Sequence, residues 1–115
     1  MSIQRLHGNG RMSQAVVHGN TVYLAGQVAD DASASIEEQT RQVLAHIDRL
    51  LAETGSARDK ILSAQIWLKD MADFAAMNSV WDAWVDRDNP PARATGQVLL
   101  ADPALRIEVI VVAAR

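Results

Sequence analysis

Two alternating stretches stand near the C-terminus, Pro90-Pro91-Ala92-Arg93-Ala94-Thr95-Gly96-Gln97-Val98 and Leu105-Arg106-Ile107-Glu108-Val109-Ile110-Val111-Val112. Both show the period-two pattern that is typical of β-strands, and the second has one unbroken apolar face. A turn at Ala101-Asp102-Pro103 is predicted to join them. We therefore expect Arg93, near the start of one strand, and Glu108, inside an apolar strand, to converge on one side of a sheet.

The chain has 115 residues, which is enough for one domain over residues 1–115 but not for a separate cofactor domain. Its net charge of -3 lacks the basic excess of nucleic-acid binders. Cysteine is absent, which excludes disulfides, a thiol nucleophile and thiolate metal sites. The N-terminus lacks the apolar region of a signal peptide, and no stretch approaches the roughly 20 apolar residues of a membrane span, so a cytoplasmic protein is expected.

The N-terminal half is expected to contain strands followed by one helix. Ile3 to Leu6 is a candidate edge strand. Residues 15–18 and 21–28 are predicted to pair around Gly19-Asn20, because glycine tolerates the positive φ at the first position of a type II′ turn. Ser35 and Glu38 have the spacing of a capping box that opens a helix. The apolar stripe of this helix ends near Gly55 and comprises Val43, Leu44, Ile47, Leu50 and Leu51.

The C-terminal half begins with a strand and a second helix. The alternation of the strand predicts one buried face, formed by Leu62, Ala64, Ile66 and Leu68. Asp70 is placed to cap the helix, and Asn89-Pro90-Pro91 is expected to end it. Apolar residues recur in the helix at three- and four-residue steps, namely Phe74, Met77, Trp81, Trp84 and Val85. The predicted order, β-β-α-β-α-β-β with one further N-terminal strand, indicates an α+β fold with both helices on one face of the sheet.

The other face of this sheet is left without helices. Large apolar groups are predicted on it, namely Tyr23, Trp67, Ile110 and Val112. Exposed apolar patches of this kind usually mark protein interfaces. We therefore expect a homo-oligomer whose sheets pack against one another, with small-molecule pockets between subunits.

Four short motifs stand in a characteristic order and spacing: Val22-Tyr23-Leu24-Ala25-Gly26-Gln27-Val28, Asp73-Phe74-Ala75-Ala76-Met77-Asn78, Pro91-Ala92-Arg93 and Ile107-Glu108-Val109. Over nearly its whole length the chain thereby resembles the Rid family of reactive-intermediate deaminases, also called the YjgF/UK114 family. The resemblance implies a chorismate-mutase-like fold and a homotrimer whose sheets enclose a central barrel. It also implies three clefts, each between neighbouring subunits.

The resemblance implies an activity as well. Family members of known activity hydrolyse 2-imino acids and their enamine tautomers, such as 2-aminoacrylate, to 2-keto acids and ammonia, without a metal or an organic cofactor. Arg93 matches the family's arginine, whose guanidinium offers parallel donors to a substrate carboxylate. Glu108 matches its glutamate, which can orient or deprotonate the attacking water. Thr95 and Gly26 match positions that line the same cleft.

Two substrate-side positions depart from the best-known imine deaminases of the family. Ala25 stands where those enzymes have a serine, so a hydroxyl contact to substrate or water is missing. Met12 falls near a tyrosine of their N-terminal loop. The chain therefore resembles a divergent branch, of the YoaB type, and the two substitutions bear on its substrate range.

Each candidate residue also has an interpretation without catalysis. Arg93 fits a solvent-exposed arginine at the end of a strand, and Glu108 fits a structural ion pair with Arg106 or Arg93. Two other function classes stay open. A binding or regulatory protein that holds a small carboxylate ligand in the same cleft is favoured by Ala25 and Met12, whereas no residue argues for a protein-partner role.

The remaining histidines, tryptophans and Met77 are assigned no chemistry. His7, His18 and His46 lack metal-ligand spacing. Met77 is expected in the core, and the tryptophans are expected in the core or at an interface.

Overall fold

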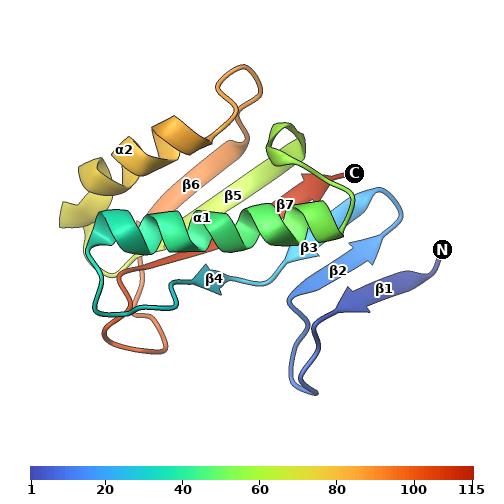
Figure 1. The fold of residues 1–115 in the computed structure, drawn as a ribbon, viewed down its shortest axis with the longest axis horizontal. Helices are drawn as coiled ribbons and strands as arrows, with labels where there is room; N and C mark the ends of the chain where they lie inside the picture. The colour runs from blue at the N-terminus through green and yellow to red at the C-terminus, as the bar shows by residue number, and fades with distance from the viewer.

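A layer of two helices covers one face of a sheet in the computed structural model, which describes residues 1–115 (Figure 1). The strands are β1 (Ile3–Leu6), β2 (Ala15–His18), β3 (Thr21–Leu24), β4 (Gln27–Val28), β5 (Ile61–Leu68), β6 (Ala92–Gln97) and β7 (Ile107–Ala114). The helices are α1 (Ile36–Glu53) and α2 (Phe74–Trp84), with short 3-10 turns at Arg58–Lys60 and Met71–Asp73. This arrangement confirms the predicted α+β class. Neither helix has the length and apolar content that a membrane crossing requires.

The sheet has the strand order β1-β2-β3-β7-β5-β6, and the short strand β4 also pairs with β7. β5 and β6 run parallel, and all other pairs are antiparallel. The two C-terminal strands are therefore not a hairpin, as the sequence suggested, because β5 lies between them. The connection from β6 to β7 instead passes the end of β5, where Val98 donates to the carbonyl of Leu68 and Lys69 donates to that of Arg106.

Turns and helix caps follow the local sequence signals. Gly19 has a φ of 61°, as the first position of a type II′ turn between β2 and β3 requires. The hydroxyl of Ser35 accepts the backbone N–H of Glu38 at 3.2 Å and caps α1. Gly55 has a φ of 78° immediately after the C-terminal cap of that helix.

β5 and α2 differ in detail from their predicted forms. Leu62 was expected in the core but is 53% exposed, because a bulge between Ile61 and Ser63 shifts the alternation and buries Ile61 instead. α2 ends at Trp84, earlier than the predicted stop before the two prolines, since Val85 already has an extended backbone.

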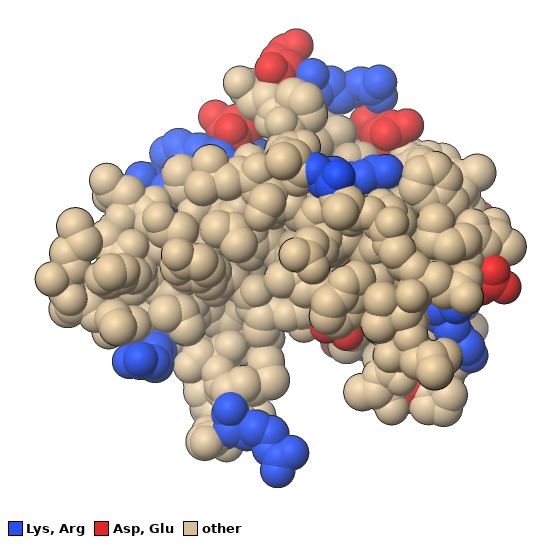
Figure 2. Space-filling model, turned by 180° about the vertical axis from the view of Figure 1, so that it is seen from behind, with Lys and Arg blue, Asp and Glu red and all other residues tan.

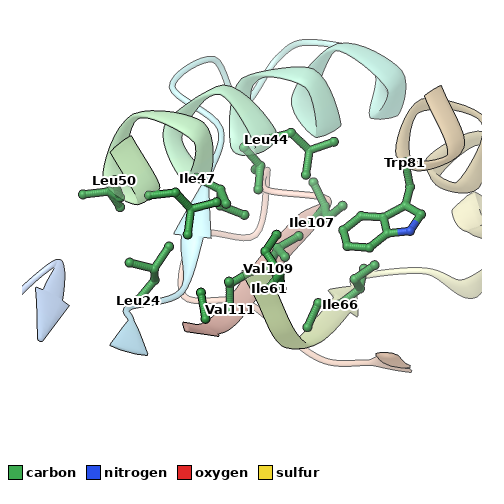
Figure 3. Packing of buried hydrophobic residues seen from close by; sticks show 14 of the residues in the cluster. Leu24, Leu44, Ile47, Leu50, Ile61, Ile66, Trp81, Ile107, Val109 and Val111 are labelled. Carbon is green, nitrogen blue, oxygen red and sulfur yellow. The ribbon is translucent and has the colours of Figure 1, made fainter. Parts of the chain in front are cut away.

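The hydrophobic core lies between the helices and the sheet (Figure 3). Ile107, Val109 and Val111 of β7 contribute the apolar face that the alternation predicts, and all three are at most 1% exposed. α1 supplies Leu44 and Ile47, which project from the helix toward these strands. Met77 and Trp81 of α2 complete this layer, as expected for core residues.

The sheet surface away from the helices is here called the open face. The strand register places on it the predicted apolar residues, namely Tyr23, Trp67, Ile110 and Val112. The only charged side chains that the strands add to this face are Arg5 and Glu108. Figure 2 shows this side of the molecule, which is largely uncharged with Lys, Arg, Asp and Glu mainly around its rim. The expected uncovered apolar surface is therefore present.

Candidate active site

Arg93 projects from β6 to the helix side of the sheet. Its strand neighbour is Ala64, a core residue that is 1% exposed, and residues paired across a ladder point to the same face. The guanidinium Nη1 donates to Oδ1 of Asn78 at 2.8 Å. Its central carbon lies 5.5 Å from the ring centroid of Trp81 and 5.9 Å from that of Phe74. Arg93 is thus a half-buried arginine fixed by α2 and does not fit the solvent-exposed interpretation.

Glu108 projects from β7 to the open face. It pairs with Val28 of β4 and Trp67 of β5, and it alternates with the core residues Ile107 and Val109. Burial raises the pKa of the Glu108 carboxyl above its ordinary value of 4.5, because desolvation disfavours the charged form. When ionised, a carboxylate with a raised pKa is a stronger proton acceptor than an ordinary surface carboxylate.

The structural ion-pair interpretation of Glu108 fails within the chain. Arg106 pairs with Asp73 instead, through bonds of 2.7 Å and 3.1 Å to the two carboxylate oxygens. Arg93 is engaged with Asn78, on the other side of the sheet. The ion pairs of the chain include neither Arg93 nor Glu108.

Gly26 provides the space that Glu108 occupies. A Cβ atom built on Gly26 would lie 1.9 Å from Oε2 and 2.8 Å from the carboxyl carbon of Glu108. Gly26 follows Ala25 in the segment between β3 and β4, directly beside the Glu108 position on β7. Two of the predicted site residues are therefore neighbours, and the absence of a side chain at Gly26 leaves room for the Glu108 carboxyl.

Arg93 and Glu108 do not converge within the chain, so the expectation that they lie on one side of the sheet is wrong. Along β5, Arg93 pairs with residue 64 and Glu108 with residue 67. An odd separation of three places their side chains on opposite faces, because successive side chains of a strand alternate. The sequence could not show this, since it depends on β5 lying between the two strands.

Met12 and Ala25 belong to two segments that hydrogen bonds tie together. Ala25 donates its backbone N–H to the carbonyl of Gln14 at 2.9 Å, and the side chain of Gln27 donates to that of Gln14 at 2.9 Å. Met12 lies two residues before Gln14, is 43% exposed, and has its backbone N–H held by the side chain of Asn9. Hydrogen bonds through Gln14 therefore join the N-terminal loop that carries Met12 to the segment that carries Ala25 and Gly26.

Thr95 lies on β6 two residues after Arg93 and points to the same, helix-facing side of the sheet. Its neighbour in β5 is the core residue Ile66. The hydroxyl oxygen of Thr95 is buried and has no hydrogen-bond partner. A buried hydroxyl without a hydrogen-bond partner is uncommon in native structures, and the Thr95 hydroxyl is such a group.

Three residues of α2 that hold Arg93 were not predicted as site residues. Phe74 and Trp81 were assigned to the apolar stripe, and Asn78 stood only as the last residue of a motif. Their spacing of i, i+4 and i+7 places all three on one helix face. That spacing, read together with an arginine on the following strand, is the sequence signal that could have found them.

The hollows of the isolated chain do not bring the candidate residues together. One of about 340 Å³ is lined by Gly26 together with His7, Asp30, His46 and other residues of α1. Another of about 400 Å³ is lined by Met12 and its neighbours in the N-terminal loop. Neither is lined by Arg93 or Glu108. No group of three or more His, Asp and Glu side chains is arranged to hold a metal ion.

Related sequences cover the chain almost completely. A RutC family protein of Haemophilus influenzae is 46% identical over 114 residues and is matched over 98% of both chains. The RutC family protein YoaB of Escherichia coli is 44% identical over 114 residues, with 99% of both chains matched.

Solved structures share the same fold. An uncharacterized protein from Pseudomonas aeruginosa superposes with a TM-score of 0.96 at 48% identity, over 99% of each chain. NMB1025 of Neisseria meningitidis, a member of the YjgF protein family, gives a TM-score of 0.97 at 43% identity over 100% of this chain and 96% of that one. YyfA of Yersinia pestis, of the Rid protein family, gives 0.92 at 26% identity. The family model described as Endoribonuclease L-PSP matches residues 2–115, and the chain belongs to this YjgF/Rid family.

Proposed function

We propose that the protein hydrolyses reactive 2-imino acids to 2-keto acids and ammonium, in clefts between copies of the chain. In each cleft, Arg93 of one copy binds the substrate carboxylate, and Glu108 of the next copy accepts a proton from the attacking water. The observation that carries this proposal is that Arg93 and Glu108, neither of which has an ion-pair partner, lie on opposite faces of one sheet. Two such groups can meet when the edge strand β6 of one copy lies beside the open face of the next copy.

The open face supports an assembly of this kind. It is largely uncharged and carries Tyr23, Trp67, Ile110 and Val112, and Tyr23 is 49% exposed in the single chain. Packing of three such faces around an axis buries this surface and generates three equivalent clefts. A homotrimer is therefore part of the proposal.

The proposed chemistry needs only positioning and proton transfer. The guanidinium of Arg93 holds the carboxylate of the protonated imine, which fixes the electrophilic carbon. Glu108, whose pKa is raised by burial, takes a proton from water as the water oxygen bonds to that carbon. The resulting carbinolamine receives this proton on nitrogen, the carbon–nitrogen bond breaks with its electron pair leaving on ammonia, and the carbonyl of the 2-keto acid forms. The last proton of the hydroxyl leaves with the ammonia as ammonium.

A binding protein without turnover is the second candidate. Ala25 and Met12 stand where the best-known deaminases of the family have a serine and a tyrosine, so two hydroxyls that could contact substrate or water are missing. In this alternative, Arg93 holds a small carboxylate ligand and Glu108 has no catalytic role.

Cleavage of RNA, the activity that the description of the family model names, has less support from the charges of this chain. The net charge is -3, and the strands give the open face only one arginine. A phosphate backbone is bound chiefly by clusters of lysine and arginine.

The experiment that separates the two main candidates is an assay with freshly generated imine. 2-Iminobutyrate is produced in situ by an amino acid oxidase, and the release of 2-oxobutyrate is followed with and without the protein. Acceleration by the wild-type protein that is lost in Arg93→Ala supports the hydrolase. Tight binding of 2-oxobutyrate without acceleration supports the binding protein.

A further inference from the structure

We infer that Asn78 is a positioning residue that holds Arg93 while leaving its positive charge uncompensated, so that the guanidinium remains available to an anionic ligand. The inference rests on the proposed role of Arg93 as the carboxylate-binding group. It adds a requirement that this role does not contain: the partner of Arg93 on α2 must be neutral.

The contacts of Arg93 with α2 are all with uncharged groups. Asn78 accepts one N–H from Nη1 at 2.8 Å, while Trp81 and Phe74 offer aromatic faces at 5.5 Å and 5.9 Å. An arginine carries five N–H donors, and an aromatic face attracts the cation without occupying those donors in conventional hydrogen bonds. Most of the guanidinium edge is therefore unused, although the group is fixed in place.

A second arginine, near the start of α2, shows the opposite arrangement. Arg106 donates from Nη2 to Oδ1 of Asp73 at 2.7 Å and from Nε to Oδ2 at 3.1 Å, and Asp73 immediately precedes α2. Asp73 is 9% exposed, so this pair is a partly buried structural ion pair. A carboxylate there compensates the charge of Arg106, whereas the amide of Asn78 leaves the charge of Arg93 intact.

The side chains of Asn and Asp have nearly the same shape but would have opposite effects on the charge of Arg93. Asn and Asp are nearly isosteric, so an aspartate at position 78 would hold the guanidinium at least as well. It would also form an ion pair that competes with any incoming carboxylate. A purely structural role of Asn78 would be preserved by this change, whereas a role in keeping the charge available would be lost.

The test compares the binding of 2-oxobutyrate by calorimetry to the wild-type protein, Asn78→Ala and Asn78→Asp. Asn78→Ala loses the positioning contact and should weaken binding several-fold. Asn78→Asp should weaken 2-oxobutyrate binding by about tenfold or more, because the new carboxylate then compensates the charge of the guanidinium. The melting temperature should stay equal or rise. The matched control is Asn89→Asp, which makes the same change of charge at an exposed residue beyond α2 and should bind like the wild type.

Equal affinities of the wild type and Asn78→Asp would overturn the inference, as would an absence of 2-oxobutyrate binding by the wild type. The outcome is separate from that of the proposed reaction. The predicted order of affinities without imine turnover would retain this inference and overturn the hydrolase. Imine turnover by the wild type with unchanged 2-oxobutyrate binding by Asn78→Asp would support the hydrolase and overturn this inference.

Discussion

The carboxylate of Glu108 lies directly against the backbone of Gly26, so close that an added Cβ atom would come within 1.9 Å of Oε2. The Glu108 carboxyl carbon and Cγ lie only 2.8 Å and 3.1 Å from that position. A methyl group at residue 26 therefore requires the whole side chain of Glu108 to turn away. The φ of Gly26 is not in the left-handed region, so the backbone itself does not require glycine there.

Gly26→Ala is expected to remove most imine hydrolysis without unfolding the protein. Displacing a catalytic group by about 1 Å can cost roughly 100-fold in rate, and the displacement needed here is larger. Single-turnover rates on fresh 2-iminobutyrate measure the loss, and the melting temperature reports on the fold. Gly8→Ala is the matched control, because a Cβ atom there meets only ordinary contacts at 3.7 Å and 3.8 Å. A wild-type rate in Gly26→Ala would exclude Glu108 from catalysis.

Glu108 also predicts how stability depends on pH. Its folded-state pKa is raised above 4.5, so between 4.5 and that raised value the folded chain binds more protons than the unfolded chain. The free energy of unfolding therefore falls as pH rises through this window. Above the window, the full penalty of burying the charged Glu108 carboxylate applies. Glu108→Gln removes the cost, so it should raise the melting temperature more at about pH 7 than at about pH 4. A constant difference between the two proteins would contradict the raised pKa, and Asp82→Asn, at an exposed carboxylate, serves as the control.

Local signals predicted most of the fold, and non-local geometry accounts for the errors. Ser35, Gly19 and Gly55 act on their immediate neighbours, so the cap and turns at these residues were confirmed. Asp70 instead caps the 3-10 turn Met71–Asp73, and α2 itself has no side-chain cap. Leu62 was misplaced because a bulge depends on how β5 pairs with β7, which alternation alone does not encode.

The candidate site shows the same division between local and non-local information. Glu108 was predicted inside an apolar strand, and it lies there. Its supposed convergence with Arg93 failed because the strand order puts β5 between them. Asn78 was missed because its role depends on the guanidinium that α2 faces, and that contact joins residues 15 positions apart.

Thr95→Val is expected to stabilise the protein slightly. The hydroxyl of Thr95 is buried without a partner, and an unsatisfied buried polar group costs about 1–3 kcal/mol. Valine has the same shape without that group, so the free energy of unfolding in urea should rise by about 1 kcal/mol. Thr40→Val is the control with the opposite sign, because the Thr40 hydroxyl is buried and donates to the carbonyl of Ile36 at 2.7 Å. Destabilisation by both substitutions would show that the Thr95 hydroxyl has a partner after all.

The opposite-face geometry of Arg93 and Glu108 makes a prediction about mixtures of inactive variants. Arg93→Ala and Glu108→Gln should each abolish most hydrolysis as homotrimers, since every cleft then lacks one group. Co-refolding equal amounts should restore activity, because a cleft that takes Arg93 from one variant and Glu108 from the other is complete. Random assembly of trimers makes about a quarter of the clefts complete, so about a quarter of the wild-type rate is expected. Sedimentation equilibrium of the same mixture checks the trimer mass. If both residues served a site within one chain, co-refolding would restore nothing, and the shared-cleft model would be wrong.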